Sequence, residues 1–149
     1  MIFKKTKWDD PDFSYLIHML DKELWINYPH LQQQYVNKNI IDTDASVIVC
    51  YDNGLPVGSG CFRETDQKST VELKRMYVNP IKRGKGIGTL ILNKLCKWAK
   101  EKGNITILLE TGIKQTEAIE MYKKYGFEVT DNYGEYKGNK NSICMRKEL

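Results

Sequence analysis

The stretch RGKGIGTL, residues 83–90, combines three glycines with two basic side chains directly before the most regular apolar pattern of the chain. Glycine has no Cβ, so the backbone at these positions can come close to a ligand. A helix that begins here would also direct its unpaired N–H groups and the positive end of its dipole at that ligand. These properties predict a phosphate site made of consecutive backbone N–H groups, those of Gly84, Lys85, Gly86, Ile87 and Gly88.

Two common phosphate loops do not fit this spacing. A P-loop requires Gly-Lys followed by Ser or Thr, whereas Lys85 is followed by Gly86. The dinucleotide fingerprint would place its third glycine at position 89, which is threonine, and no early βαβ unit surrounds the stretch. We therefore expect a pyrophosphate loop of a third kind.

Other reactive residue types are not arranged for catalysis or metal binding. The serine of GSG, residues 58–60, has glycine directly on both sides and does not fit the G-x-S-x-G nucleophile elbow. His18 and His30 have no cysteine or acidic partner at metal-ligand spacing, so no metal is expected. The cysteines include no CxxC pair, which predicts buried thiols in a reducing cytoplasm at Cys50, Cys61, Cys96 and Cys144.

The elements that must position the loop follow a regular order along the chain. Apolar runs predict strands at 2–8, 46–51, 56–63, 70–78, 105–109, 127–129 and 142–146. Helical periodicity predicts helices from residue 11, near 32–34, from 84 to the stop signal at 103–104, and at 116–125. The turn signal DNG at 52–54 predicts a hairpin between the second and third strands.

This order predicts a mixed α/β or α+β fold, in which helices cover both faces of one sheet. Strict alternation in the strand at 70–78 divides its side chains between two faces. One predicted face carries Glu72, Lys74, Met76 and Val78, and the other carries Leu73, Arg75 and Tyr77.

Composition limits the class of protein. A length of 149 residues suits one domain, 1–149, that folds alone. The hydrophobic share of 41% with 28% charged residues is typical of a soluble globular protein and argues against disorder. A net charge of +4 suits an anionic ligand without indicating nucleic acid. The sequence shows no signal peptide and no apolar stretch of membrane-spanning length, which predicts a cytoplasmic protein.

Two segments resemble the signatures of the GCN5-related N-acetyltransferase (GNAT) superfamily. The superfamily's acyl-CoA loop reads Arg/Gln-x-x-Gly-x-Gly/Ala, and within VELKRMYVNPIKRGKGIGTLILNKL it is filled by Arg83, Gly86 and Gly88. Its second segment reads Ala-x-x-hydrophobic-Tyr-x-x-x-Gly-Phe, and AIEMYKKYGFEV fills it with Ala118, Met121, Tyr122, Gly126 and Phe127. The resemblance covers residues 44–147, and the preceding residues match in element order.

The resemblance implies a GNAT-type central sheet, mostly antiparallel, with a splayed strand pair, and acetyl-CoA as cosubstrate. The pyrophosphate would lie at the glycine loop and the pantetheine arm along the strand at 70–78. Gln115 stands where many relatives have an asparagine that reaches the pantetheine. The implied cofactor-binding residues are Met76, Tyr77, Val78, Arg83, Gly84, Lys85, Gly86, Ile87, Gly88, Thr89, Gln115 and Tyr122.

Two residues are the catalytic candidates that the resemblance implies. Tyr122 falls on the motif's tyrosine, which in relatives acts as general acid toward the departing thiolate, a role that suits a phenol of pKa about 10. The alternative is a core tyrosine that packs on the cofactor. Glu72 falls where the histone-modifying branch holds a base that acts directly or through water, and the alternative is a simple ion pair on the strand.

The favoured function is therefore an N-acetyltransferase that acts on the primary amine of a small molecule by direct attack in a ternary complex. A protein acetyltransferase that modifies a lysine or N-terminus, and a non-catalytic acyl-CoA sensor, stay open as alternatives. The expected partner is a small-molecule amine, with no nucleic acid and no membrane, and a homodimer is one option for the assembly. Acceptor specificity is expected in the N-terminal helices and the loop at 131–140, which carry no interpretable motif.

Overall fold

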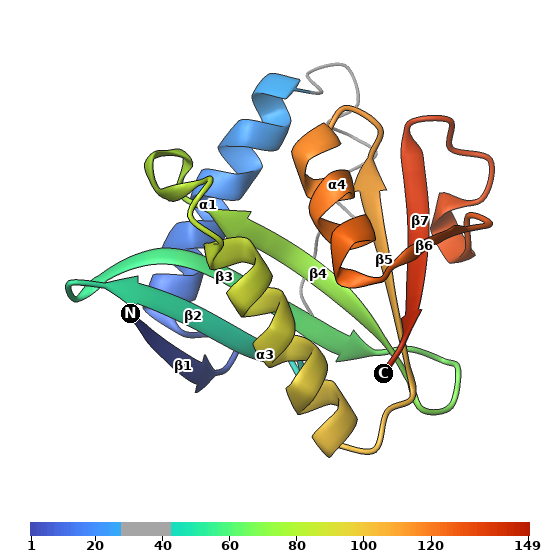
Figure 1. Cartoon of the computed structure of the whole chain (residues 1–149), viewed down its shortest axis with the longest axis horizontal. Coiled ribbons are helices and arrows are strands. Elements are labelled where there is room, and N and C mark those ends of the chain that lie inside the picture. The colour runs from blue at the N-terminus through green and yellow to red at the C-terminus, as the bar shows by residue number, and fades with distance from the viewer. Residues whose placement is uncertain (28–42) are drawn as a thin grey trace.

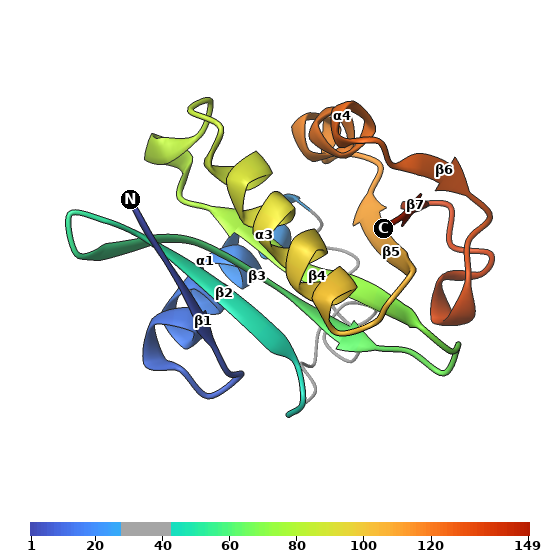
Figure 2. The same cartoon turned by 60° about the horizontal axis from the view of Figure 1, so that its bottom comes forward.

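The computed structural model describes residues 1–27 and 43–149 and places one central sheet between helices on its two faces (Figures 1 and 2). The sheet has seven strands in the order β1-β2-β3-β4-β5-β7-β6. All neighbouring strands are antiparallel except β4 and β5, which confirms the predicted mostly antiparallel α/β fold. The strands are β1 (Ile2–Thr6), β2 (Ser46–Asp52), β3 (Leu55–Glu64), β4 (Thr70–Val78), β5 (Thr106–Gly112), β6 (Glu128–Thr130) and β7 (Ser142–Glu148).

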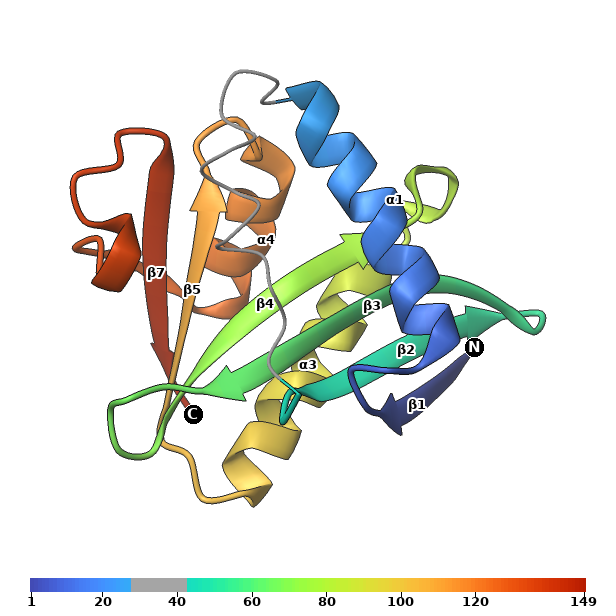
Figure 3. The same ribbon diagram turned by 180° about the vertical axis from the view of Figure 1, so that it is seen from behind.

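The helices form a layer on each face of the sheet. Helix α1 (Pro11–Asn27) covers one face, whereas α3 (Ile87–Glu101) and α4 (Thr116–Tyr125) lie on the other, as the rear view of Figure 3 shows. The described residues also include the short 3-10 turns η2 (Pro80–Lys82) and η3 (Gly134–Tyr136). None of the helices in the described ranges is long and apolar enough to cross a membrane. The helix predicted near 32–34 lies outside the described residues.

Asp10 fixes the start of α1. Its Oδ1 accepts hydrogen bonds from the backbone N–H groups of Asp12 (2.8 Å) and Phe13 (3.3 Å). Its Oδ2 accepts from the Thr6 hydroxyl (2.8 Å) and pairs with Lys4 Nζ (2.7 Å). Burial raises the pKa of this carboxyl, but the hydrogen bonds from Lys4, Thr6 and the backbone outweigh it and lower the pKa to about 2.

The described residues form an apolar cluster on each face of the sheet. Helix α3 contributes a stripe at helical spacing to the larger cluster, which includes Ile91, Leu92, Leu95, Phe62, Val71, Leu73, Ile107 and Met145. Helix α1 contributes to the smaller cluster, which includes Phe13, Leu16, Val47, Val49, Cys61 and Tyr77. These clusters hold the strands that carry the site rigidly between the two helical layers.

Strands β4 and β5 pair over only part of their length. Their parallel register runs from Thr70 opposite Thr106 to Leu73 opposite Leu109 and then ends. Beyond that point β4 stays with β3 as far as Val78, while β5 stays with β7, so the two strands diverge (Figures 1 and 3). We call the opening between residues 74–78 of β4 and 110–112 of β5 the fork. It confirms the predicted splayed strand pair.

A β-bulge interrupts β4 at the fork. Ser59 of β3 lies opposite Tyr77, but Cys61, two residues further along β3, lies opposite Lys74, three residues away on β4. The extra residue is accommodated near Arg75, whose φ of +60° lies in the left-handed region. Bulges of this kind redirect side chains locally.

The bulge overturns the alternation predicted for β4. Leu73 belongs to the larger cluster, to which α3 contributes, and Met76 and Val78 pack against the same cluster. Strict alternation had placed Leu73 on the opposite face from Met76 and Val78. Tyr77 belongs to the smaller cluster, on the α1 face of the sheet. The prediction that Glu72 and Met76 share a face is wrong, because one inserted residue reverses the alternation that follows it.

Candidate active site

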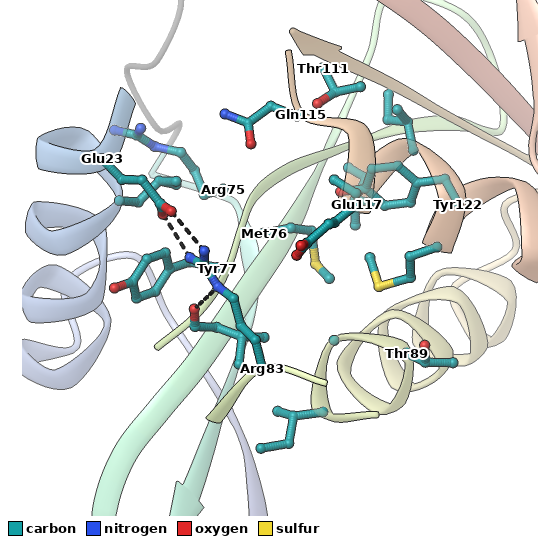
Figure 4. A pocket seen from close by; sticks show the side chains of 18 of the residues that line it. Glu23, Arg75, Met76, Tyr77, Arg83, Thr89, Thr111, Gln115, Glu117 and Tyr122 are labelled. Carbon is teal, nitrogen blue, oxygen red and sulfur yellow. Dashed lines mark hydrogen bonds and ion pairs between the residues drawn. The ribbon is translucent and has the colours of Figure 1, made fainter. Parts of the chain in front are cut away.

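A pocket of about 440 Å³ occupies the fork (Figure 4). Its walls come from residues 73–78 of β4, 109–112 of β5, the loop that leads into α3, the C-terminal half of α1 and the first turns of α4. All residues predicted to bind the cofactor line this pocket except Lys85, which is exposed beside it. Glu72 is not among the lining residues.

The loop before α3 uses glycines in a backbone conformation that other residues rarely adopt. Gly84 has φ of +80° and Gly86 has φ of +82°. A Cβ built at either position would have no atom within 4 Å, so both glycines border open space. A side chain there would be strained and would also occupy the volume above the loop.

The same loop presents a run of unpaired donors. In the described ranges, the backbone N–H groups of residues 84–89 have no hydrogen-bond partner, and the first helical bond of α3 runs from Leu90 N–H to Gly86 O (3.1 Å). Gly86 is the N-cap residue of this fifteen-residue helix. Consecutive N–H groups at a helix N-terminus, with the positive end of the helix dipole behind them, suit an anion.

Gly88 has a different local role from the two preceding glycines. A Cβ at this position would lie 2.9 Å from Met121 Sδ on α4. The absence of a side chain therefore lets the first turn of α3 pack closely against α4, while the Gly88 N–H stays available to the pocket.

Arg83 is held by α1. Its Nη1 and Nη2 each lie 2.7 Å from a carboxylate oxygen of Glu23, and its Nε donates to Val78 O (2.8 Å). The guanidinium also lies over the Tyr77 ring, 5.6 Å from the ring centroid. Arg83, which is predicted to bind the cofactor, is thus engaged with a carboxylate that also lines the pocket (Figure 4).

Tyr122 of α4 lies in the opposite wall of the pocket. Its ring is buried and packs edge-on against Phe127, with 5.6 Å between ring centroids. Burial, together with the nearby Glu110 carboxylate, raises the pKa of the phenol, so the hydroxyl keeps its proton and remains a donor at neutral pH. Among the described residues its hydroxyl has no hydrogen-bond partner.

Glu72 lies before the fork, in the paired part of β4. Its side chain is 2% exposed. Its Oε1 accepts from Arg63 Nε (3.0 Å) and Nη2 (2.8 Å), and its Oε2 accepts from the Tyr133 hydroxyl (2.6 Å). Both carboxylate oxygens are therefore engaged, which matches the ion-pair interpretation and does not support direct contact with a ligand in the pocket.

Gln115 stands at the start of α4, where its backbone N–H donates to Gly112 O (3.0 Å). Its side chain makes no capping hydrogen bond, and Figure 4 shows its amide at the side of the pocket nearer Arg75. Its longer stem, compared with the asparagine of many relatives, still reaches the pocket.

Several lining residues were not identified from the sequence. Glu23 and Arg75 were missed because their partners, Arg83 and Asp21, are 60 and 54 residues away in the chain. Glu110 had a signal that could have been used: it is the first polar residue after the apolar run 105–109, where a splayed strand would expose it. In residues 1–27 and 43–149 no group of three or more potential metal ligands occurs.

Comparison with known proteins identifies the architecture around this pocket. The sequence profile of the acetyltransferase (GNAT) family matches residues 6–127. The chain is 32% identical over 135 residues to the IAA acetyltransferase of Azospirillum brasilense, which covers 90% of this chain and 88% of that protein.

Solved structures show the same fold. A Klebsiella pneumoniae protein described as a candidate acyl-CoA N-acyltransferase superposes with a TM-score of 0.83 at 27% identity, over 99% of this chain and 97% of that one. The PaiA N-acetyltransferase of Thermoplasma acidophilum, solved in complex with coenzyme A, superposes with a TM-score of 0.71 at 20% identity over 100% of both chains.

The family match spans most of the chain and includes the strand, loop and helices that form the pocket. The protein therefore belongs to the GNAT family and is an N-acetyltransferase.

Proposed function

We propose that this protein transfers the acetyl group of acetyl-CoA to the primary amine of a small molecule, by direct attack in a ternary complex within the fork. The observation that carries the proposal is the run of unpaired N–H groups at residues 84–89, which borders a pocket that also contains the Tyr122 hydroxyl. One end of the pocket thus suits phosphates, and its interior holds a proton donor.

The residues present fit acetyl-CoA. The N–H groups of residues 84–89 would hold the pyrophosphate, since a Cβ at Gly84 or Gly86 would occupy open space that the loop leaves for a ligand. The β5-facing backbone of residues 74–78 has no strand partner and would hold the amide-containing arm. The PaiA enzyme, which has the same fold, was solved in complex with coenzyme A, and this supports acetyl-CoA as the cosubstrate.

Bound acetyl-CoA supplies an acetyl group activated as a thioester. In the balanced reaction the amine nitrogen forms a C–N bond as the C–S bond breaks. The ammonium group loses two of its three protons, of which one ends on the thiol and the other is released to solvent. The protein must therefore orient the amine, stabilise negative charge on the carbonyl oxygen, and supply a proton to the sulfur.

Tyr122 is the residue that we assign to protonation of the sulfur. Its raised pKa keeps the phenol protonated, and its hydroxyl has no competing partner among the described residues. The edge-on contact with Phe127 fixes the ring, so the phenolic oxygen is held in one position. A fixed donor is more effective than a mobile one because its orientation need not be gained during the reaction.

We assign Glu72 to positioning rather than to direct proton abstraction. Its two oxygens bind Arg63 and Tyr133, so it connects β3 and β4 to the segment that leads into η3. That segment belongs to the 131–140 loop, in which the sequence predicts acceptor specificity. Loss of the carboxylate would therefore disturb this loop, and through it the acceptor specificity expected there.

The proposal is tested by measuring thiol release from acetyl-CoA with a panel of small amines, peptides with free N-termini and lysine peptides, with mass spectrometry of the products. Acetylation of small amines at rates well above those of peptides supports the proposal. Preferential acetylation of peptides would establish a protein acceptor instead. Tight acetyl-CoA binding without turnover on any amine would establish a sensor.

A further inference from the structure

Arg75 is a cation that β4 buries in the wall of the pocket. Its side chain is only 7% exposed and lines the fork. Its φ of +60° at the bulge is uncommon for a residue with a side chain. In Figure 4 Arg75 and Thr89, in the first turn of α3, lie on opposite sides of the pocket, so Arg75 stands away from the N-terminal turn of that helix. Backbone strain of this kind is found at ligand sites.

Asp21 of α1 does not satisfy the whole guanidinium. The Asp21 Oδ1 accepts a hydrogen bond from Arg75 Nη1 at 2.6 Å, but the second contact, from Arg75 Nη2 to Asp21 Oδ2, is long at 3.5 Å. The Arg75 Nε is buried and has no hydrogen-bond partner among the described residues. A buried N–H without an acceptor is rare in proteins, and together with the long Nη2 contact it shows that Asp21 leaves part of the hydrogen-bonding capacity of this guanidinium unused.

Lys74 and Glu110 stand where the fork opens. Pairing of the two strands ends at Leu73 and Leu109, which makes these the first residues past the paired segment, and both line the pocket. Burial lowers the pKa of Lys74, so an anion in the pocket would stabilise its charged form. On the other wall, the Glu110 carboxylate accepts the Ser142 hydroxyl at 2.5 Å. The fork thus has two cations on β4 and a carboxylate on β5.

We propose that the acceptor is an amine that also carries a carboxylate, as a free amino acid does. Arg75 and Lys74 bind the carboxylate, and the amine lies on the Glu110 side of the fork. This inference rests on the proposed acetyl transfer and names the substrate class of that site. Its basis is the match between the charges of a zwitterion and the opposite charges on the two walls.

The inference separates free amino acids from protein acceptors. Within a protein, the carboxyl group next to an N-terminal amine is part of a peptide bond and has no charge. A carboxamide derivative of an amino acid reproduces this difference while keeping the amine and the side chain. The acid and its carboxamide are therefore a matched pair for the test.

The test compares kcat/KM for the proteinogenic amino acids and their carboxamides. The wild-type protein is expected to prefer the acid about 10- to 100-fold, the range that one charge-assisted hydrogen-bonded contact provides. Arg75→Gln should remove most of this preference, and Arg75→Lys should keep part of it because the charge remains. Asp21→Asn should keep it, because Arg75 then loses only its contact with α1.

Direct binding gives a second readout that does not depend on turnover. In titrations of the CoA-saturated protein, the acid is expected to bind more tightly than its carboxamide, and Arg75→Gln should remove the difference. Equal kcat/KM for acid and carboxamide would overturn the inference and leave the acetyltransferase proposal intact. Equal defects in Arg75→Gln and Asp21→Asn, with an unchanged acid preference, would show that Arg75 only holds α1. Absence of acetylation of every small amine would instead overturn the proposed function.

Discussion

Replacing Gly86 by valine tests whether this position requires glycine only for its backbone conformation or also for acetyl-CoA binding. Gly86 has φ of +82° and opens to empty space, and Gly103, after α3 and outside the pocket, has φ of +92° with equally open surroundings. Gly103→Val is therefore a matched control, because it imposes the same kind of backbone strain away from the site.

The expected magnitudes follow from these surroundings. A side chain in the left-handed region costs about 1–2 kcal/mol, so each variant should lose that much free energy of unfolding. For a chain of this length the loss corresponds to a decrease in Tm of about 2–8 °C. Only Gly86→Val also fills the space above the unpaired N–H groups. Loss of even two charge-assisted hydrogen bonds there would weaken acetyl-CoA binding by about 100-fold or more.

The assay is isothermal titration of acetyl-CoA into both variants, with Tm measured on the same samples. We expect Gly103→Val to bind like the wild type and Gly86→Val to bind weakly or not at all. Binding of Gly86→Val within about threefold of the wild type would refute the assignment of the loop, since about 0.6 kcal/mol is less than one charge-assisted contact. Equal loss of binding in the two variants would attribute the effect to strain alone.

Further predictions concern the walls of the pocket and the start of α1. Tyr122→Phe should lower kcat by about 100-fold or more with little change in acetyl-CoA affinity or Tm, and a single-turnover rate within about threefold of wild type would remove the hydroxyl from the mechanism. Glu72→Gln should lower Tm, and it should lower activity by a factor that does not change with pH. An activity defect that shrinks as pH rises would instead indicate that Glu72 is the base. Glu23→Gln should tighten acetyl-CoA binding about two- to fivefold by releasing the partly exposed Arg83, and calorimetry that shows weaker binding would contradict this. The depressed pKa of Asp10, about 2, contributes stability that is present above the unfolded pKa of about 3.9 and is lost as pH falls through 2, and a pH titration of Tm should show this loss in wild type but not in Asp10→Asn.

The parts of the site that follow from local chemistry could be predicted from the sequence. The loop and α3 could be placed because glycine spacing and apolar periodicity act over a few residues, and Asn53 and Gly54 adopt the positive φ values expected of a tight hairpin turn. The splayed strand pair was predicted only through the family resemblance, because apolar runs in a sequence do not show where the pairing of two strands ends.

The parts that depend on long-range contacts could not be predicted. The bulge at Arg75 cannot be recognised in the sequence of β4, which is compatible with strict alternation, although the bulge decides which side chains face the pocket. The partners of Glu72 come from β3 and from a loop 61 residues away, so the residue type alone could not distinguish a base from an ion pair. The same limit applies to Arg83, whose carboxylate partner is on α1.

We propose that the fork holds acetyl-CoA with its pyrophosphate on the glycine loop and its sulfur beside Tyr122. A crystal structure of the complex with coenzyme A tests this claim most directly. We expect pyrophosphate oxygens within hydrogen-bonding distance of backbone N–H groups in residues 84–89, and the sulfur within the fork near the Tyr122 hydroxyl. Coenzyme A bound outside the fork, or with its phosphates away from this loop, would contradict the account.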